Sequence, residues 1–288
     1  AVVDVCRRRG VPCVLLKGVT DRADSTGKED ILANVKPVSR RLALVVADGL
    51  GGPSPRDDGL GRKVLRFAKI EHSLFSLPLL LAGAWLGAGG DWPAWTVLGL
   101  IALAGVGART LGMSMNRILD RRLDALNPRT AGRELPSGGM SLAAACGVAA
   151  AGAALYLLAC GLLGTTCLML SPVPAVPLLA YALLKRFTPL CHFGIGLCLA
   201  LAPLGAFVAA ADALPGQVEV LLLALFAFCW ISGSDIIYAL QDIESDRTTG
   251  VRSIPASLGP WRAQPVAAAV HAVAAAAPVM LWPVSYTP

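Results

Sequence analysis

The chain has 288 residues, of which 55% are hydrophobic and only 15% are charged, and its mean hydropathy is +0.63. Soluble globular proteins carry about 25% charged residues, so this composition excludes an ordinary soluble enzyme. The charge is also unevenly distributed, because 23 of the 44 charged residues lie within the first 72 positions. We therefore expect a short charged piece followed by an all-α membrane domain.

The first 48 residues predict a short α/β fragment. The stretch Cys6–Asp24 indicates a helix, a short buried strand and an acidic turn, and apolar residues then recur at helical intervals over Ile31–Leu50. This pattern resembles the C-terminal end of the nucleoside phosphorylase and nucleosidase enzymes, including futalosine hydrolase, in which the acid matching Asp21 helps to protonate the departing base. An unrelated α/β piece is the alternative, and we expect no nucleosidase activity from so short a segment. Residues 49–61 read as a flexible linker.

Apolar runs without charge predict seven membrane-spanning helices in the domain that follows, residues 62–288. About 20 residues of helix cross the ~30 Å hydrocarbon layer, and the abundant small residues allow helices to pack closely in lipid. The predicted spans are Ser73–Gly90, Trp92–Ala108, two spans within Gly139–Leu184 that meet near Gly161–Thr166, Phe187–Ala211, Val220–Ser234 extending towards Leu240, and Ala263–Pro288.

The basic residues predict the orientation of these spans. Ten of the 11 basic residues beyond position 72 lie in the connections that follow spans two, four and six, whereas the other three connections carry only Asp91, Asp212 and Glu219. Basic connections face the cytoplasm by the positive-inside rule. We therefore expect a multi-pass protein of the bacterial inner membrane with its active site on the cytoplasmic side.

Two sets of oxygen-bearing side chains recur at four-residue spacing near the ends of spans two and six. They are Asn116, Asp120 and Asp124 in the first set, and Asp242 and Asp246 in the second, with Asp235 seven residues before Asp242 on the same predicted side. Carboxylates at this depth are costly unless they face a cavity or a cation, and oxygen ligands without His or Cys suit Mg²⁺. The pattern predicts a Mg²⁺-diphosphate site over an apolar cavity. The alternative is that these are solvated helix ends whose acids pair with arginines.

The same segments resemble the signatures of the UbiA-type intramembrane prenyltransferases. The first signature is matched by Asn116–Asp124 with Asn127–Gly138, the second by Asp235–Gly259, the entry to the first helix by Ile70–Pro78, and the 4–5 connection by Tyr181–Gly196. The resemblance implies a bundle of nine helices around a central cavity that opens sideways to lipid. About seven of the nine are present, so the domain is expected to be truncated at its C-terminus, with two helices beyond Pro288.

The resemblance also implies a reaction and roles for individual residues. Mg²⁺ binds a polyprenyl diphosphate, whose ionisation gives an allylic cation that attacks an electron-rich aromatic acceptor. The residues carried over by motif are Asn116, Asp120 and Asp124 for the first Mg²⁺ set, Asp242 and Asp246 for the second, and Arg121, Lys185 and Arg186 for the diphosphate. The implied partners are these two substrates and the lipid bilayer; no nucleic-acid partner is expected.

The acceptor is predicted less directly. Arg109, Asp235 and Tyr238 are candidates for the acceptor or cavity side of the site, and Arg109 either reaches an acceptor carboxylate or pairs with Asp235. Likeness to the menaquinone branch of the family, which serves the futalosine route, favours a dihydroxynaphthoate. The alternative is 4-hydroxybenzoate, as in ubiquinone synthesis. A membrane transporter is the alternative of another class, disfavoured because the acids lie at helix ends on one membrane face. His192 and His271 are expected to be interior hydrogen-bonding residues.

Overall fold

The computed structural model describes residues 64, 67 and 76–284, with side chains described as far as residue 280. The chain divides into two compact units, Ala1–Asp58 and Gly59–Pro288, and the described residues all belong to the second. The expected α/β fragment, the linker and the first residues of the membrane domain lie outside the described residues. Within the described part, the ordered elements are all helices.

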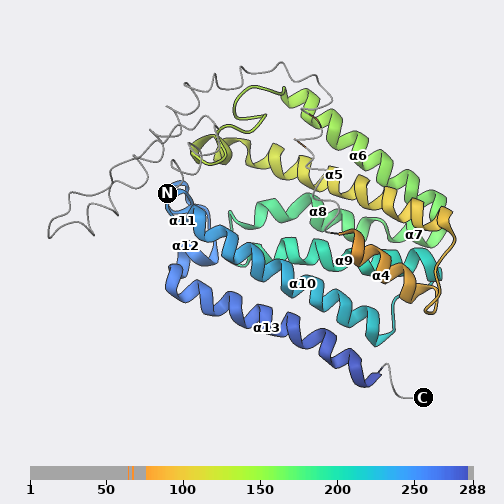
Figure 1. Ribbon diagram of the computed structural model, residues 1–288. Coiled ribbons are helices and arrows are strands. Elements are labelled where there is room, and N and C mark those ends of the chain that lie inside the picture. Colours follow the sequence, from red (N-terminus) through yellow and green to blue (C-terminus); the bar gives the residue numbers. More distant parts are fainter. Residues whose placement is uncertain (1–63, 65–66, 68–75, 285–288) are drawn as a thin grey trace, which may run out of the picture. The chain divides into compact units, whose positions relative to one another are not determined.

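The helices follow the predicted spans closely (Figure 1). In chain order they are α4 (Leu77–Gly87), α5 (Trp95–Leu126), α6 (Leu142–Leu163), α7 (Thr165–Leu170), α8 (Pro172–Leu184), α9 (Cys191–Ala211), α10 (Val218–Ala239), the 3₁₀ turn η2 (Leu240–Asp242), α11 (Ile243–Thr249), α12 (Ile254–Leu258) and α13 (Pro260–Val284).

Six helical segments of the described part are long and apolar enough to cross a membrane. Two of them combine neighbouring elements, α7 with α8 and α10 with α11. The first predicted span differs, because its described helix α4 has only 11 residues and is shorter than a full crossing. The expectation of an all-α membrane bundle is confirmed.

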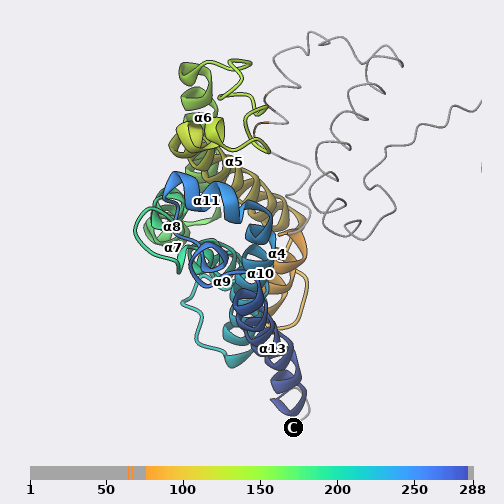
Figure 2. The ribbon, with the colours of Figure 1, turned by 90° about the vertical axis from the view of Figure 1, so that its left-hand side faces the viewer.

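The helices pack as a continuous bundle in which α9 has the central place. It contacts α4, α8 and α10, while α5 packs against α6 and α8, and α13 packs against α10. The ends of α5 and α10 that lead into the basic connections lie at the same end of the bundle, on the left in Figure 1. Figure 2 views the bundle from this end, with α11 towards the viewer. The two acidic sets therefore reach one region, although their members are 118 to 130 positions apart in sequence.

Two breaks interrupt the long helical segments, one at Gly164 and one at the 3₁₀ turn η2. Gly164 separates α6 from α7 within the interval predicted for the turn, and its φ of 139° is unfavourable for residues with a side chain. The 3₁₀ turn η2 interrupts the helix between Asp235 and Asp242. Asp235 and Asp242 also have different partners, because Asp235 is bonded to His192 whereas Asp242 accepts hydrogen bonds from Asn127 and Arg129.

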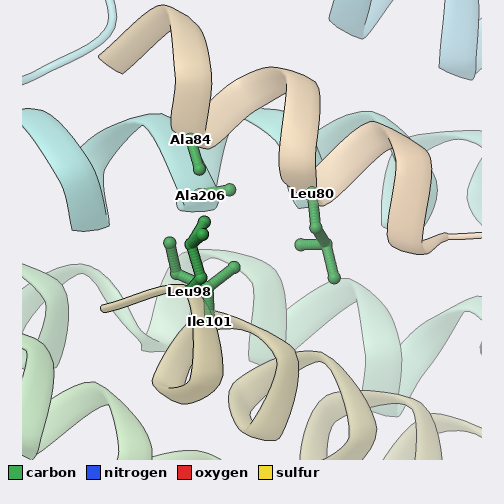
Figure 3. Packing of buried hydrophobic residues seen from close by; sticks show 5 residues of the cluster. All are labelled: Leu80, Ala84, Leu98, Ile101 and Ala206. Atoms are coloured by element: carbon green, nitrogen blue, oxygen red, sulfur yellow. The ribbon is translucent and has the colours of Figure 1, made fainter. Parts of the chain in front are cut away.

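Small residues allow the close helix contacts that hold the bundle. One apolar cluster joins α4, α5 and α9 through Leu80, Ala84, Leu98, Ile101 and Ala206 (Figure 3). Between α5 and α6 the contact is closer, because a Cβ atom at Gly107 would lie 2.6 Å from the backbone nitrogen of Tyr156. Contacts of this kind replace the hydrophobic effect, which lipid does not supply between helices.

Replacing Gly107 with alanine is expected to destabilise the bundle by about 1–3 kcal/mol, because the added methyl group forces α5 and α6 apart. The matched control is Gly99→Ala on the same helix, where the added Cβ meets nothing within 4 Å. Thermal unfolding in detergent measures both variants. Equal melting temperatures for the two would contradict the close α5–α6 contact.

Candidate active site

The first acidic set lies in the last three turns of α5, with two of its members buried. Asp120 is 2% exposed and Asp124 is 7% exposed. Asn116 donates a hydrogen bond from Nδ2 to Oδ2 of Asp120 at 3.3 Å, one helical turn away. Four-residue spacing on a continuous helix therefore aligns the three oxygen-bearing side chains as the sequence predicted.

The second set lies beyond the 3₁₀ turn, and each of its acids is held by a neighbouring segment. Asp242 accepts hydrogen bonds from Asn127 Nδ2 at 2.9 Å and from Arg129, whose Nε lies 2.9 Å and whose Nη2 lies 2.5 Å from the carboxylate. These bonds raise the pKa of the Arg129 guanidinium, which stays charged. Asp246 accepts from Ser253 Oγ at 2.7 Å.

Cations lie between the acids and join the two sets. Lys185 donates to Asp120 Oδ2 at 2.5 Å and also lies within electrostatic range of Asp246. Arg133 donates to both oxygens of Asp124, at 2.9 and 2.8 Å, and interacts electrostatically with Asp242. These contacts agree with the alternative expectation that the acids pair with basic residues. The pairs tie α5 to the loop that follows it, through Arg133, and to the loop that follows α8, through Lys185.

The acids present oxygen ligands of the kind that Mg²⁺ prefers, and one buried atom fits that role directly. In the described residues no three His, Cys, Asp or Glu side chains converge as a ready-made metal cluster. Oδ1 of Asp120 is nevertheless buried, and no donor from the described part of the chain reaches it. A buried carboxylate oxygen without a donor is costly unless a cation is bound, so Asp120 fits a Mg²⁺ ligand.

The predicted diphosphate residues do not lie together. Lys185 is among the acids, whereas Arg121 donates to the Ile118 carbonyl at 3.0 Å and Arg186 donates to the Leu119 carbonyl at 2.7 Å. The two arginines line a separate pocket of about 520 Å³ together with Arg122. Of the three, only Lys185 donates a hydrogen bond to an acid of either set, and Arg186 also lies within electrostatic range of Asp120.

An apolar cavity of about 350 Å³ occupies the interior of the bundle, between α4, α5, α6, α8 and α9. Its lining includes Arg109 on α5 and Tyr181 on α8 among many aliphatic side chains. Tyr181 also lies within electrostatic range of Arg109, Asp120 and Asp235. Through Tyr181, the lining of the cavity is therefore within electrostatic range of one acid on α5 and one on α10.

The other two candidates for the acceptor side have different surroundings. Tyr238 accepts a hydrogen bond from Arg129 Nη1 at 3.1 Å, and its ring lies under the same guanidinium at 5.1 Å. It belongs to the group around Asp242. Asp235 is paired with His192, whose Nδ1 lies 2.7 Å from Oδ2 of the carboxylate. The partner in this bond is therefore His192 and not Arg109, which was the candidate from the sequence.

Sequence reasoning missed several residues that hold the acids in place, above all Asn127, Arg129, Arg133 and Ser253. All four lie in stretches that resemble the family signatures, the first three in Asn127–Gly138 and Ser253 in Asp235–Gly259. The residues with which they pair could not be predicted from the sequence, since Arg129, for example, pairs with Asp242, 113 positions away. Ser253 is the N-cap of α12, and its bond to Asp246 depends on where that short helix lies.

Comparison with known proteins identifies the family. Residues 76–288 match the UbiA prenyltransferase family. The 4-hydroxybenzoate octaprenyltransferase of Paracidovorax citrulli (strain AAC00-1) is 30% identical over 210 residues, which are 72% of this chain and 69% of that protein. The enzyme of the same name from Aliivibrio fischeri (strain MJ11) is 32% identical over 65% of this chain and 66% of its own length. The chain thus spans about two thirds of these relatives.

Solved structures agree with this assignment. The apo structure of a UbiA homolog from Aeropyrum pernix K1 is 41% identical, with a TM-score of 0.67 over 72% of this chain and 77% of that one. The UbiA homolog from Archaeoglobus fulgidus bound to GPP and Mg²⁺ has the same fold, at 21% identity and a TM-score of 0.59 over 75% and 76% of the two chains. With its six apolar helical segments, the protein is a multi-pass integral membrane protein, and it belongs to the UbiA prenyltransferase family.

Proposed function

We propose that this transferase moves a polyprenyl group from a polyprenyl diphosphate to 4-hydroxybenzoate or a closely similar aromatic acid. The reaction takes place at the basic end of the bundle, on the cytoplasmic side of a bacterial inner membrane, and depends on Mg²⁺. The observation that carries this proposal is an apolar cavity lined in part by Tyr181, which lies within electrostatic range of Asp120 on α5 and Asp235 on α10. The ammonium group of Lys185 donates a hydrogen bond to the first of these acids. A polyprenyl diphosphate needs an apolar cavity for its prenyl chain beside a charged site for its diphosphate.

The residues divide between the two parts of the prenyl donor. Asn116, Asp120, Asp124, Asp242 and Asp246 would hold Mg²⁺, which when bound neutralises charge on the leaving diphosphate. Lys185 and Arg129 lie among these acids and can bind diphosphate oxygens, because ammonium and guanidinium groups form strong charge-assisted hydrogen bonds to phosphate. The aliphatic lining of the cavity receives the prenyl chain and excludes water from the ionising bond.

The chemistry also requires a group that accepts a proton. The bond between the first prenyl carbon and the diphosphate oxygen breaks, and both electrons leave with the diphosphate. A ring carbon beside the acceptor hydroxyl forms the new carbon–carbon bond, and its hydrogen leaves as a proton. Asp235 is proposed to take this proton, because its side chain is 37% exposed and lies within electrostatic range of Tyr181, which lines the cavity.

The choice of acceptor rests on the relatives. Those described above are named for 4-hydroxybenzoate, so the alternative from the sequence is better supported than the dihydroxynaphthoate first favoured. Arg109 on the cavity wall matches the carboxylate that both acids carry. The dihydroxynaphthoate remains the second candidate, supported by the likeness of three motifs to the menaquinone branch: Arg129–Leu135, Lys185–Phe193 and Asp235–Asp242.

The direct test is prenyl transfer in native membranes with the two aromatic acids in competition. We expect Mg²⁺-dependent prenylation with 4-hydroxybenzoate as the preferred acceptor at equal concentrations. Preference for the dihydroxynaphthoate would reverse the acceptor assignment but would still agree with the proposed prenyltransferase activity. Solute uptake into vesicles without prenylation would instead support the transporter alternative.

Replacing Arg109 with glutamine is expected to raise the KM for the aromatic acid roughly 10–100-fold. The loss of a charge-assisted hydrogen bond of about 1.5–3 kcal/mol sets this range. The methyl ester of the same acid is the matched control, because it lacks the charge that Arg109 binds. Equal increases in KM for acid and ester would show that Arg109 does not contact the carboxylate.

A further inference from the structure

One buried histidine lies against the acceptor side of the site and has no role in the mechanism above. His192, near the start of α9, is 2% exposed. Its Nδ1 lies 2.7 Å from Oδ2 of Asp235 on α10, and its Nε2 lies 3.3 Å from the backbone nitrogen of Ile254 on α12. The ring therefore joins three helices through two hydrogen bonds.

The two bonds fix where the ring carries its proton. A backbone N–H can only donate, so Nε2 of His192 accepts from Ile254 and carries no hydrogen. The neutral ring then has its hydrogen on Nδ1, which donates to Asp235. The short bond holds one oxygen of the carboxylate from its buried side, because the His192 ring that donates it is itself shielded from water.

The same short helix also holds the second acidic set. Ser253, which directly precedes Ile254, donates from Oγ to Oδ2 of Asp246 at 2.7 Å. His192 itself lies within electrostatic range of Asp246. Two consecutive residues at the start of α12 thus fix Asp246 on one side and, through His192, Asp235 on the other.

We propose that His192 is a positioning residue, whose Nδ1–H, fixed by the Ile254 amide, aims the Asp235 carboxylate at the proton that leaves the aromatic acceptor. This inference rests on the proposed function, in which Asp235 takes that proton. The Asp235 side chain is 37% exposed while its Oδ2 is held, so the carboxylate stays accessible to a ligand. A base held in one orientation transfers protons faster than one that rotates among several.

Three substitutions separate positioning from a purely structural tie. His192→Ala removes both bonds. In His192→Asn the amide nitrogen falls at the place of Nδ1 and can still donate to Asp235, whereas in His192→Gln the amide oxygen falls at the place of Nε2 and can still accept from Ile254. Loss of an orienting partner costs roughly 10–100-fold, so we expect kcat to fall by that factor in the alanine and glutamine variants. The asparagine variant should stay close to wild type, and the KM for polyprenyl diphosphate should not change.

His271 on α13 supplies a matched control, because it contacts the same helix, α10. Its Nε2 lies 3.3 Å from Oγ of Ser234, the residue just before Asp235, and its Nδ1 bonds to the Ala267 carbonyl. His271→Ala therefore removes a histidine contact to α10 without touching Asp235, and its kcat should stay close to wild type. Rescue by glutamine rather than asparagine at position 192, or an equal loss in His271→Ala, would overturn the proposal.

Nitrogen-15 NMR of the imidazoles tests the inference without any turnover. The chain has only three histidines, so His192 is assigned by its disappearance in His192→Asn. We expect the neutral Nδ1–H form in the wild type. In Asp235→Asn we expect the same form with a shifted Nδ1 resonance, because Nδ1–H loses its charged acceptor while the Ile254 amide still donates to Nε2. An Nε2–H ring, or a ring unaffected by Asp235→Asn, overturns the inference even in an inactive protein. A wild-type protein with the expected ring and no transfer contradicts the proposed function instead.

Discussion

Replacing Asp120 with asparagine is expected to lower prenyl transfer by about 10²–10³-fold, the usual cost of removing one group that stabilises charge in a transition state. Asp120 is the most deeply buried acid of the site, and its Oδ1 meets no donor among the described residues. Asparagine keeps the shape of the side chain but removes the charge that would bind Mg²⁺. Initial rates in membranes at saturating Mg²⁺ measure the loss.

The control is Asp212→Asn, in the connection that follows α9 at the other end of the bundle. Asp212 has a positive φ of 50°, which asparagine tolerates, so this change should not disturb the backbone. A second readout is the shift of melting temperature on adding Mg²⁺, expected in wild type and Asp212→Asn and lost in Asp120→Asn. Full activity and an unchanged Mg²⁺ shift in Asp120→Asn would remove this residue from the metal site.

Replacing Lys185 with methionine is expected to lower the free energy of unfolding by about 3 kcal/mol in the absence of Mg²⁺. The substitution leaves the Asp120 carboxylate, which is 2% exposed, without its cationic partner. It also removes a cation proposed to bind the diphosphate, so the KM for polyprenyl diphosphate should rise. Thermal unfolding and initial rates measure the two effects separately.

Added Mg²⁺ should recover more stability in Lys185→Met than in wild type, since the metal replaces the missing charge beside Asp120. The double variant Asp120→Asn with Lys185→Met is the control. It should unfold at a higher temperature than Lys185→Met alone, because it leaves no unpaired buried charge. If the double variant is less stable by the sum of both single losses, Lys185 does not act through Asp120.

Local pattern determined the bundle and the first acidic set. Uncharged runs of about 20 residues form helices in lipid because every backbone group must be satisfied within the segment, so the long helices α5, α6, α9, α10 and α13 overlap the runs predicted as spans. Asn116, Asp120 and Asp124 lie on one helix, and their alignment follows from helical geometry alone. The likeness of these motifs to the UbiA family was sufficient to name the family, because it needs no contact between distant residues.

Only the tertiary structure decided which cation pairs with which acid. The bonds Lys185–Asp120, Arg129–Asp242 and His192–Asp235 join residues 43 to 113 positions apart, and none follows from sequence spacing. The 3₁₀ turn at Leu240–Asp242 likewise does not follow from the sequence pattern. Three residues of altered pitch rotate the side chains that follow, and whether the turn forms depends on what α10 and α11 pack against. Sequence thus determined which groups are present, and packing determined the direction in which each of them points.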